Sequence, residues 1–232
     1  MAPPQLRLYR QPQWRERAMK TQRVFLTGST GYIGSRLIPI LTARGHRVAA
    51  LIREQSRHKL PPNCDAVPGS ALDGNSYSAA VEGADTFIHL IGVPHPSPAK
   101  ARQFIEIDLK SAKEAIRVAS AAHIRHFIYM SVAHPAPVMR AYVAARSAGE
   151  QLLLESGLNA TILRPWYVLG PGHRWPYLLL PLYGIARIFP ATCDSARRLA
   201  PVTLEQVLRS IEAAVEDPPS GVRVVEALQI SR

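Results

Sequence analysis

Arg23-Val-Phe-Leu-Thr-Gly-Ser-Thr-Gly-Tyr-Ile-Gly34 is the stretch that decides the fold. A short apolar run, Val24 to Leu26, leads into three glycines spaced Gly28-x-x-Gly31-x-x-Gly34. A helical pattern of apolar residues follows, made of Ile33, Leu37, Ile40 and Leu41. This order predicts a strand, a tight turn and a helix, and such a turn is typical of a cradle for a pyrophosphate.

Each glycine of the turn has its own task. Gly28 lets the chain reverse, Gly31 lets the backbone approach the phosphates, and Gly34 lets the helix lie close to the strand. The first free N–H groups of the helix and the positive end of its dipole then face the anion. The predicted cofactor-binding residues here are Gly28, Thr30, Gly31, Tyr32, Ile33 and Gly34. The alternative is a glycine-rich turn that holds no ligand.

The second predicted strand, Val48 to Ile52, ends at Arg53. In this kind of fold an acidic residue at that place binds the ribose 2′-hydroxyl of NAD, whereas an arginine accommodates the 2′-phosphate of NADP. Arg53 therefore favours NADP(H) over NAD(H). Two alternatives stay open, because Glu54 could turn inward and Arg53 could be a solvated charge at the strand end.

The glycine motif also carries a family resemblance. Thr27-Gly-Ser-Thr-Gly-Tyr-Ile-Gly34 resembles the TGxxGxxG signature of the extended and atypical short-chain dehydrogenase/reductase superfamily, and the resemblance runs from about Thr21 to about Ile230. The chain is most similar to the atypical NAD(P)H-binding branch with NmrA-like proteins and relatives of a complex I accessory subunit. The resemblance implies an α/β fold, a doubly wound parallel sheet of the Rossmann type, with a small C-terminal cap.

Length and composition set the limits. A chain of 232 residues with 47% hydrophobic content can bury the core of one domain, expected over 21–232 with a cap segment at about 173–200. Nearly half of the net charge of +11 lies in residues 1–23, made up of a basic leader at 1–20 and Arg23 just beyond it. We expect this leader to be disordered. It lacks the apolar stretch of a secretory signal peptide. No nucleic-acid recognition module is visible, so we expect no nucleic-acid partner.

Cysteine and histidine usage indicates neither disulfides nor metal. Cys64 and Cys193 lie far apart without a metal-binding spacing, which favours a reduced, cytoplasmic protein. His123 and His126 straddle a predicted helix-to-strand turn, and we expect both at the surface and neither as a metal ligand. The cofactor is expected to be NADP, with NAD as the alternative, and no metal site is predicted.

Two further segments should reach the cofactor cleft. Asp85 to Gly92 is a buried fourth strand, and the resemblance implies that its end, at Leu90 and Gly92, lines the cofactor near the ribose and nicotinamide. The proline-rich loop after it places His95 as a candidate substrate contact. Family members commonly carry an Asp near the adenine where this chain has Ser70, so adenine recognition differs there.

The candidate catalytic residues are Ser131, Tyr142 and Arg146. In the superfamily a Ser orients the substrate carbonyl, a Tyr exchanges the proton, and a Lys four residues later lowers the Tyr pKa and binds the nicotinamide ribose. Arg146 stands in the place of that Lys. A guanidinium keeps the positive charge and can bond ribose hydroxyls but cannot relay protons, so cofactor binding should survive the substitution better than turnover. The alternative is structural, with Arg146 and Glu150 as a helix ion pair and Tyr142 as a packing residue.

The segment after the sixth predicted strand, Arg164-Pro-Trp-Tyr-Val-Leu-Gly170, resembles the family segment that covers the nicotinamide. We expect Pro165 and Val168 at the cofactor, and Trp166, Tyr167 and Trp175 at the substrate. The apolar run from Trp175 to Ala186 is too short to span a membrane, and it favours a substrate lid, with contact to a membrane face or a partner as the alternative.

Taken together, the residues predict an NADP(H)-binding oxidoreductase or epimerase that acts on a small, largely apolar carbonyl or alcohol. The alternative is a cofactor binder without turnover, either a redox sensor of the NmrA kind or an assembly factor for a respiratory complex. The change from Lys to Arg146 favours this alternative, whereas Ser131 and Tyr142 favour the enzyme.

Overall fold

The fold is known from a computed structural model of the chain, which describes residues 21–172 and 199–231. The leader at 1–20, most of the expected cap, and with it Trp175, lie outside the described residues.

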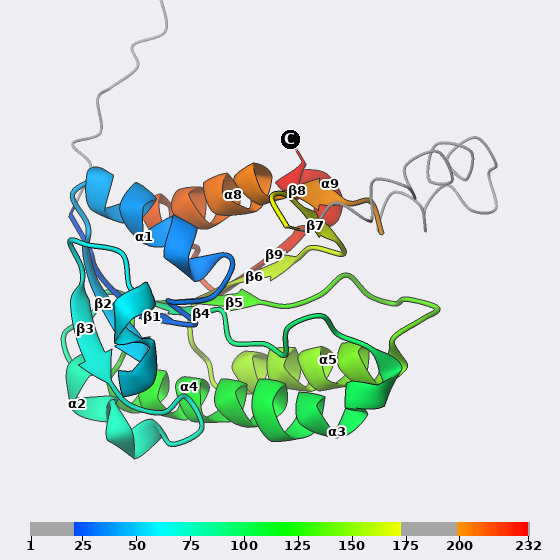
Figure 1. The fold of residues 1–232 in the computed structure, drawn as a ribbon, viewed down its shortest axis with the longest axis horizontal. Coiled ribbons are helices and arrows are strands. Elements are labelled where there is room, and N and C mark those ends of the chain that lie inside the picture. The colour runs from blue at the N-terminus through cyan, green and yellow to red at the C-terminus, as the bar shows by residue number, and fades with distance from the viewer. Residues whose placement is uncertain (1–20, 173–198, 232) are drawn as a thin grey trace, which may run out of the picture.

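The centre of the molecule is a parallel sheet of seven strands in the order β3-β2-β1-β4-β5-β6-β9 (Figure 1). Its strands are β1 Arg23–Thr27, β2 Arg47–Ile52, β3 Asp65–Pro68, β4 Thr86–His89, β5 His126–Met130, β6 Ala160–Arg164 and β9 Val222–Glu226. A small separate pair joins β7 Val168–Leu169 to β8 Val202–Thr203. The order reverses direction between β1 and β4, which is where open α/β sheets bind their ligands, beyond the carboxyl ends of the strands.

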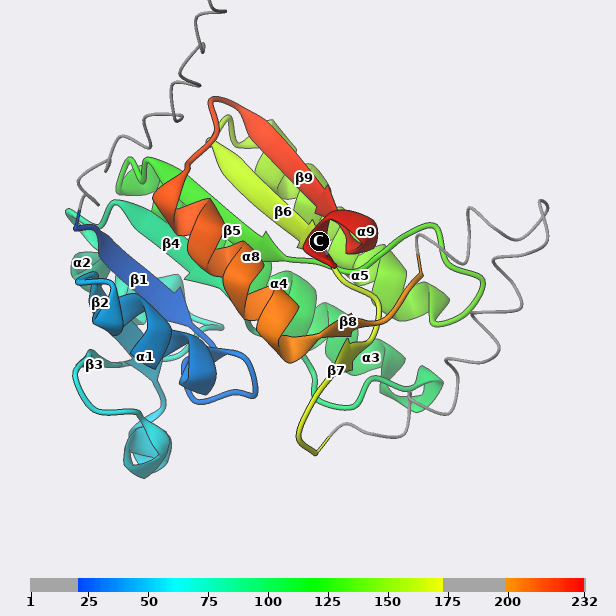
Figure 2. The same cartoon turned by 90° about the horizontal axis from the view of Figure 1, so that it is seen from above.

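Helices cover both faces of the sheet, so the predicted doubly wound fold is confirmed (Figures 1 and 2). One face carries α1 Gly34–Ala43, α8 Leu204–Glu216 and α9 Ala227–Ile230. The other face carries α2 Ser78–Val81, α3 Ala101–Gln103, α4 Lys110–Ala121 and α5 Arg140–Glu155. Within the described part of the chain, no helix has both the length and the apolar character needed to cross a bilayer.

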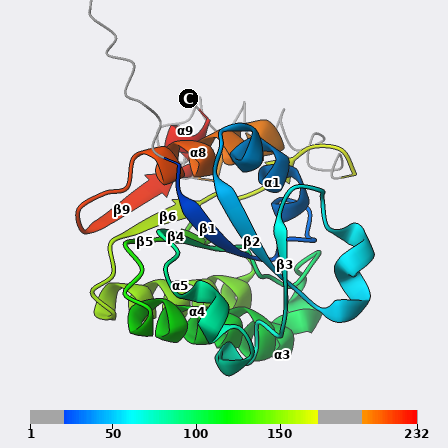
Figure 3. The same cartoon turned by 90° about the vertical axis from the view of Figure 1, so that its left-hand side faces the viewer.

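The side-on view shows why the strands are buried on both sides. In Figure 3 the sheet lies between α1 and α8 on one face and α4 and α5 on the other. Its strands are accordingly near-continuous apolar runs such as Phe25-Leu26 and Phe127-Ile128, all without exposed surface. Two clusters of buried residues result, one under α1 and α8 and one under α4 and α5.

Aromatic rings stiffen the second cluster. The ring of Phe87 on β4 lies 5.1 Å from that of Phe25 on β1 and 5.1 Å from that of Phe127 on β5. The ring of Tyr77 stacks on Phe25 at 5.5 Å. This row runs across the three central strands and joins their packing into one unit.

One sequence expectation is wrong. His126 is not at the surface: it is fully buried on β5, and its Nε2 lies 2.9 Å from the hydroxyl oxygen of Thr161 on β6. His123 is exposed, as expected. Between α3 and α4, Phe104–Leu109 forms a π-helix. The wider turn of a π-helix changes which side chains face the sheet, and it is frequently found at functional sites.

We predict that Phe87→Ala destabilises the fold by about 3–5 kcal/mol, because it leaves a cavity between two neighbouring rings. Chemical unfolding monitored by circular dichroism measures the difference. Leu154→Ala on the exposed side of α5 is the matched control and should change stability by about 0.5 kcal/mol or less. Equal losses in the two variants would contradict the assignment of Phe87 to the core.

Candidate active site

A cavity of about 860 Å³ opens at the carboxyl ends of β1, β2, β4, β5 and β6. It brings together every site residue predicted from the sequence except Trp175, which lies outside the described residues. The predicted residues on its wall are Gly28, Thr30, Gly31, Tyr32, Ile33, Gly34, Arg53, Leu90, Gly92, His95, Ser131, Tyr142, Arg146, Pro165, Trp166, Tyr167 and Val168. The local sequence motifs thus converge on one cavity although they lie up to 140 residues apart, from Gly28 to Val168.

The glycine turn has the shape needed to hold a diphosphate. Gly28 has φ +78, and the N–H of Gly31 donates to its carbonyl oxygen at 3.0 Å. A Cβ on Gly34 would lie 2.3 Å from that same carbonyl oxygen, so only glycine allows α1 to begin this close to β1. The helix therefore presents its free amino-terminal N–H groups to the cavity, which fits an anionic dinucleotide.

The end of β2 supplies positive charge to the same cavity. Arg53 is exposed and follows directly on the buried Leu51 and Ile52. Lys59, at the end of a short 3₁₀-helix, lines the cavity as well and was missed from the sequence. Ser70 also lies on this wall, in the place where the family resemblance led us to expect an Asp.

Arg146 is a buried clamp between two strands. Its side chain is 4% exposed, and its Nη1 donates to the carbonyl oxygen of Met130 on β5 at 2.8 Å. Nη2 donates to the carbonyl oxygen of Ile91, just beyond β4, at 3.1 Å. Gly92 must be glycine for this approach, since a Cβ there would lie 2.2 Å from Nη2. Burial opposes the charge, but Tyr142, Tyr129 and Asp108 outweigh it and raise the pKa of Arg146.

Asp108 is the ion-pair partner of Arg146, and the sequence reasoning missed it. One carboxylate oxygen, Oδ1, lies 2.8 Å from Nη2 of Arg146, and the other accepts the N–H of Val93 at 3.0 Å. Burial raises the pKa of Asp108, and the guanidinium partly offsets this effect. A signal was present, because Asp108 lies four residues after Phe104 and four before Ala112, on a face that is otherwise apolar.

The helix ion pair expected between Arg146 and Glu150 is therefore wrong. Glu150 pairs with Arg164 on β6, whose Nε donates to it at 3.0 Å, and Arg164 also reaches Glu226 at 2.8 Å. Burial opposes ionisation of Glu150, but hydrogen bonds from Arg164 and Ser131 outweigh it and lower its pKa. The carboxylate ties α5 to β5, β6 and β9 at the carboxyl edge of the sheet.

The hydroxyl of Ser131 is oriented by this carboxylate. Ser131 donates its proton to Glu150, and the side chain of His134 meets the second carboxylate oxygen at 3.3 Å. A serine hydroxyl has one proton to give, so Ser131 offers only lone pairs in other directions. At the cavity wall its side chain is an acceptor.

Tyr142 lies between an aromatic ring and a cation. Its ring centroid is 5.1 Å from that of Phe104 and 5.4 Å from Cζ of Arg146. Val93, Ile107 and Met139 belong to the same apolar cluster as Tyr142, and Met130 and Trp166 line the same cavity. This half of the cavity can hold a largely apolar group next to a phenolic hydroxyl.

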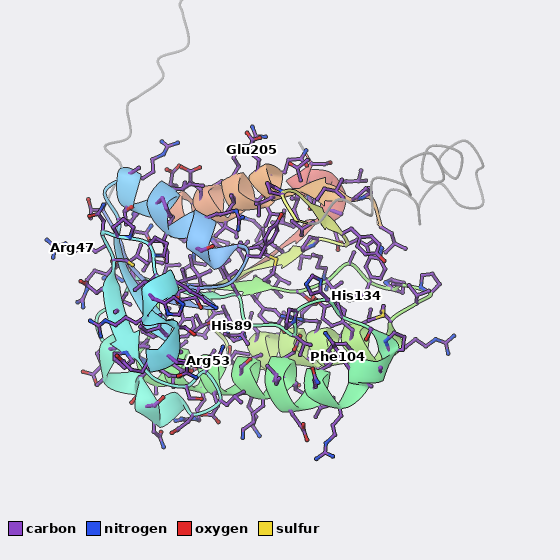
Figure 4. The ribbon with its side chains drawn as sticks, viewed as in Figure 1. Arg47, Arg53, His89, Phe104, His134 and Glu205 are labelled. Atoms are coloured by element: carbon purple, nitrogen blue, oxygen red, sulfur yellow. The ribbon has the colours of Figure 1, made fainter. Side chains whose placement is uncertain are left out.

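His89 lies near the cavity but belongs to the core. His89 on β4 is fully buried, and its Nδ1 lies 2.9 Å from the hydroxyl of Thr27. Burial, with Arg146 nearby, lowers its pKa to about 3, so it is a neutral core residue. Figure 4 shows His89 near the middle of the molecule, above Arg53 and to the left of His134 in this view. Within 21–172 and 199–231 no three His, Cys, Asp or Glu side chains are grouped to hold a metal ion.

Comparison with known proteins gives an independent identification of the cofactor class. Residues 28–173 match the model of a family described as NAD(P)H-binding. Ceramide reductase of Caulobacter vibrioides is 27% identical over 204 residues, which cover 86% of this chain and 62% of that protein. An uncharacterised sugar epimerase of Bacillus subtilis is 30% identical over 154 residues, which cover 62% of this chain and 71% of that protein. The chain spans less than two thirds of the length of the first curated relatives that it matches, with shares of 62%, 31% and 57%.

Solved structures share the fold. The enzyme WbmH of Bordetella bronchiseptica, in complex with NAD+, superposes with a TM-score of 0.68 at 21% identity, covering 90% of this chain and 76% of that one. A short-chain dehydrogenase/reductase superfamily protein of Agrobacterium tumefaciens with bound NAD gives a TM-score of 0.64 at 18% identity, covering 87% and 76%.

We predict that Gly34→Ala weakens the binding of NADPH and NADH at least about tenfold, because the new methyl group pushes α1 away from the carbonyl of Gly28. Isothermal titration calorimetry measures the affinity. Thr42→Ala, on the same helix and remote from the turn, is the control and should bind like the unmodified protein. A folded Gly34→Ala protein with full affinity would refute the diphosphate site.

Proposed function

Because the chain belongs to the NAD(P)H-binding family, as its resemblance to the short-chain dehydrogenase/reductase superfamily predicted, we propose that it is an NADP(H)-dependent oxidoreductase of largely apolar carbonyls or alcohols. The observation that carries the proposal is the single cavity that joins the glycine turn to Ser131 and Tyr142. Membership of the NmrA-like branch stays a prediction.

Different residues along the cavity would bind different parts of the cofactor and the substrate. The N–H groups at the start of α1 would hold the diphosphate, Arg53 and Lys59 the adenosine phosphate, and the ends of β4 and β6 the nicotinamide half. When bound, the cofactor supplies or accepts a hydride at the substrate carbon. Tyr142 gives or takes the proton at the substrate oxygen, and Ser131 accepts a hydrogen bond beside it. The apolar wall around Met130, Met139 and Trp166 favours substrates with a hydrophobic body.

The relatives support this substrate class. They include a ceramide reductase and a ketoreductase of a farnesyl-bearing dihydroquinoline oxide. A sugar epimerase is related as well, so epimerisation through a transient carbonyl is a second activity of the same site. Both activities need the same hydride and proton transfers.

A cofactor binder without turnover, such as a redox sensor of the NmrA kind or a respiratory-complex assembly factor, is the second candidate. It is favoured by Arg146, whose two terminal nitrogens are already bonded to backbone carbonyls and to Asp108. Arg146 in this position holds the strands together, and Nη2 is occupied by both Ile91 and Asp108. Contact with a membrane face or partner through the segment after Gly172 belongs to this second candidate.

We predict that Arg53→Ala lowers the affinity for NADPH about tenfold or more and leaves the affinity for NADH nearly unchanged, because a charged hydrogen bond to the 2′-phosphate contributes about 1.5–3 kcal/mol. Fluorescence titration with both cofactors measures the preference. Arg57→Ala is the matched control, since Arg57 is exposed, pairs with Glu54 and is absent from the cavity wall. An Arg53→Ala protein that kept its preference would discredit this assignment.

We predict that Tyr142→Phe lowers turnover of NADPH with aldehydes and ketones by about 10²–10⁴-fold, the usual contribution of a positioned acid or base. The assay follows NADPH absorbance against a panel of apolar carbonyls. Tyr77→Phe is the control: Tyr77 is buried away from the cavity, and its hydroxyl has no hydrogen-bond partner. Undiminished turnover would remove Tyr142 from the mechanism, and NADPH binding without any turnover in the unmodified protein would favour the second candidate.

A further inference from the structure

Glu150 on α5 is a buried carboxylate with both oxygens occupied. Its side chain is 5% exposed. Oε1 accepts the hydroxyl proton of Ser131 and the Nε proton of Arg164, the latter at 3.0 Å. Oε2 accepts from Nη2 of Arg164 and lies 3.3 Å from Nε2 of His134. An ionised carboxylate only accepts, so the proton between Ser131 and Glu150 belongs to Ser131.

The hydroxyl of Ser131 is held in this direction. Ser131 is 2% exposed, and its backbone N–H already donates to the carbonyl oxygen of Leu163 at 2.8 Å. Turning the hydroxyl proton towards the cavity would break its bond to the charged oxygen of Glu150. Hydrogen bonds to charged groups are about twice as strong as neutral ones, so the observed direction is favoured by about tenfold to a hundredfold.

Ser131 faces the helical layer that carries Tyr142. Side chains alternate across a strand, and Phe127 and Tyr129 of β5 belong to the cluster under α4 and α5. Ser131 continues this alternation two residues after Tyr129, in agreement with its bond to Glu150 on α5. Ser131 and Tyr142 also line the same cavity.

One guanidinium connects the serine and the tyrosine. Arg146 lies on α5 one turn after Tyr142 and one turn before Glu150. Its Nη1 donates to the carbonyl oxygen of Met130, the residue before Ser131, at 2.8 Å. Its Cζ is 5.4 Å from the ring centroid of Tyr142. The two hydroxyl groups therefore belong to one wall, where that of Tyr142 can donate and that of Ser131 only accepts.

We propose that Glu150 is a positioning residue that makes Ser131 a hydrogen-bond acceptor for the substrate, so that the site selects carbonyl compounds with a hydroxyl on the neighbouring carbon. The inference rests on the proposed function. A plain ketone offers only acceptor atoms, and its lone pairs would meet those of Ser131. An α-hydroxy ketone donates to Ser131 while its carbonyl oxygen accepts from Tyr142.

The substrate is then held at two points during reduction. The carbonyl carbon gains a hydride from the reduced nicotinamide, the C=O π bond breaks, and the oxygen takes the proton of Tyr142. A vicinal diol and an oxidised nicotinamide result, and the phenolate regains a proton from water. The hydroxyl bonded to Ser131 is unchanged and serves to orient the carbonyl.

α-Hydroxyacetophenone and α-methoxyacetophenone are the probes, because both carry an apolar ring and only the first has the donor. Absorbance of NADPH gives kcat/KM for each compound, and the preference is the ratio of the hydroxy to the methoxy value. We expect this preference to be about tenfold or more higher in the unmodified protein than in Ser131→Ala. Comparing the ratio between proteins cancels the intrinsic reactivity of the two ketones.

Removal of the carboxylate tests Glu150 itself. Glu150→Met with Arg164→Met takes out both charges together, because a single unpaired ion in the interior would destabilise the fold. Ser131 then has no carboxylate to donate to, so the preference should fall to that of Ser131→Ala or below. Glu205→Met with Arg209→Met is the matched control: this exposed ion pair lies on α8, on the opposite face of the sheet, and its loss should keep the preference.

An equal preference in the unmodified protein and in Ser131→Ala would overturn the inference, and so would a folded Glu150→Met/Arg164→Met protein that kept the unmodified preference. Should this double variant not fold, the comparison with Ser131→Ala decides alone.

Calorimetry separates the inference from the proposed function. Both ketones are titrated into the protein loaded with NADP+, which has no hydride to give. Tighter binding of the hydroxy ketone that is lost in Ser131→Ala, in a protein that reduces neither compound with NADPH, would support the acceptor role of Ser131 and refute the reductase. Reduction of both ketones without a preference would refute only the acceptor role, and binding of neither would overturn both.

Discussion

The close approach of α1 to β1 is the constraint on which the rest of the site depends. The carbonyl oxygen of Gly28 would be 2.3 Å from a Cβ at Gly34, so backbone meets backbone with no side chain between them. This contact aims the free amides of the helix at the carboxyl edge of the sheet, where the order of strands reverses between β1 and β4. Every other element of the cavity is placed relative to that edge because the seven strands are parallel and share it.

The opposite half of the cavity depends on buried charge. Arg146 joins the carbonyls beyond β4 and at the end of β5, and Arg164 joins α5 to β6 and β9 through Glu150 and Glu226. Each guanidinium is matched by a carboxylate, as burial requires, since an unpaired ion in the interior costs several kcal/mol. The rigid wall against which Ser131 and Tyr142 lie is built from these pairs. Replacing the superfamily's Lys by Arg146 therefore makes this position part of the framework.

The sequence predicted what is encoded locally and missed what depends on packing. The strand, turn and helix around Gly28 follow from neighbouring residues. The cavity residues after Arg53 were predicted mainly through the family resemblance. His126 was misplaced because a polar residue at the start of a strand gives no sign of its partner Thr161, which lies 35 positions away. Asp108 was missed because the π-helix at Phe104–Leu109 brings an acidic side chain onto Arg146, and helical periodicity alone assigns no partner to it. Lys59 was missed because its place at the cavity depends on the path of the short 3₁₀-helix after β2, which the sequence does not give.

Hydrogen-bond polarity connects the two halves of the site. Ser131 donates its only hydroxyl proton to Glu150, and the lowered pKa of Glu150 keeps that side chain a carboxylate. At the cavity Ser131 can therefore accept a hydrogen bond but cannot donate one. A substrate carbonyl oxygen is also only an acceptor, and it finds no donor in Ser131. Among these two residues the donor for that oxygen must be Tyr142, which is a donor only while it keeps its proton. In the proposed function the hydroxyl of Tyr142 therefore faces the substrate carbonyl oxygen, and Ser131 accepts a hydrogen bond beside it.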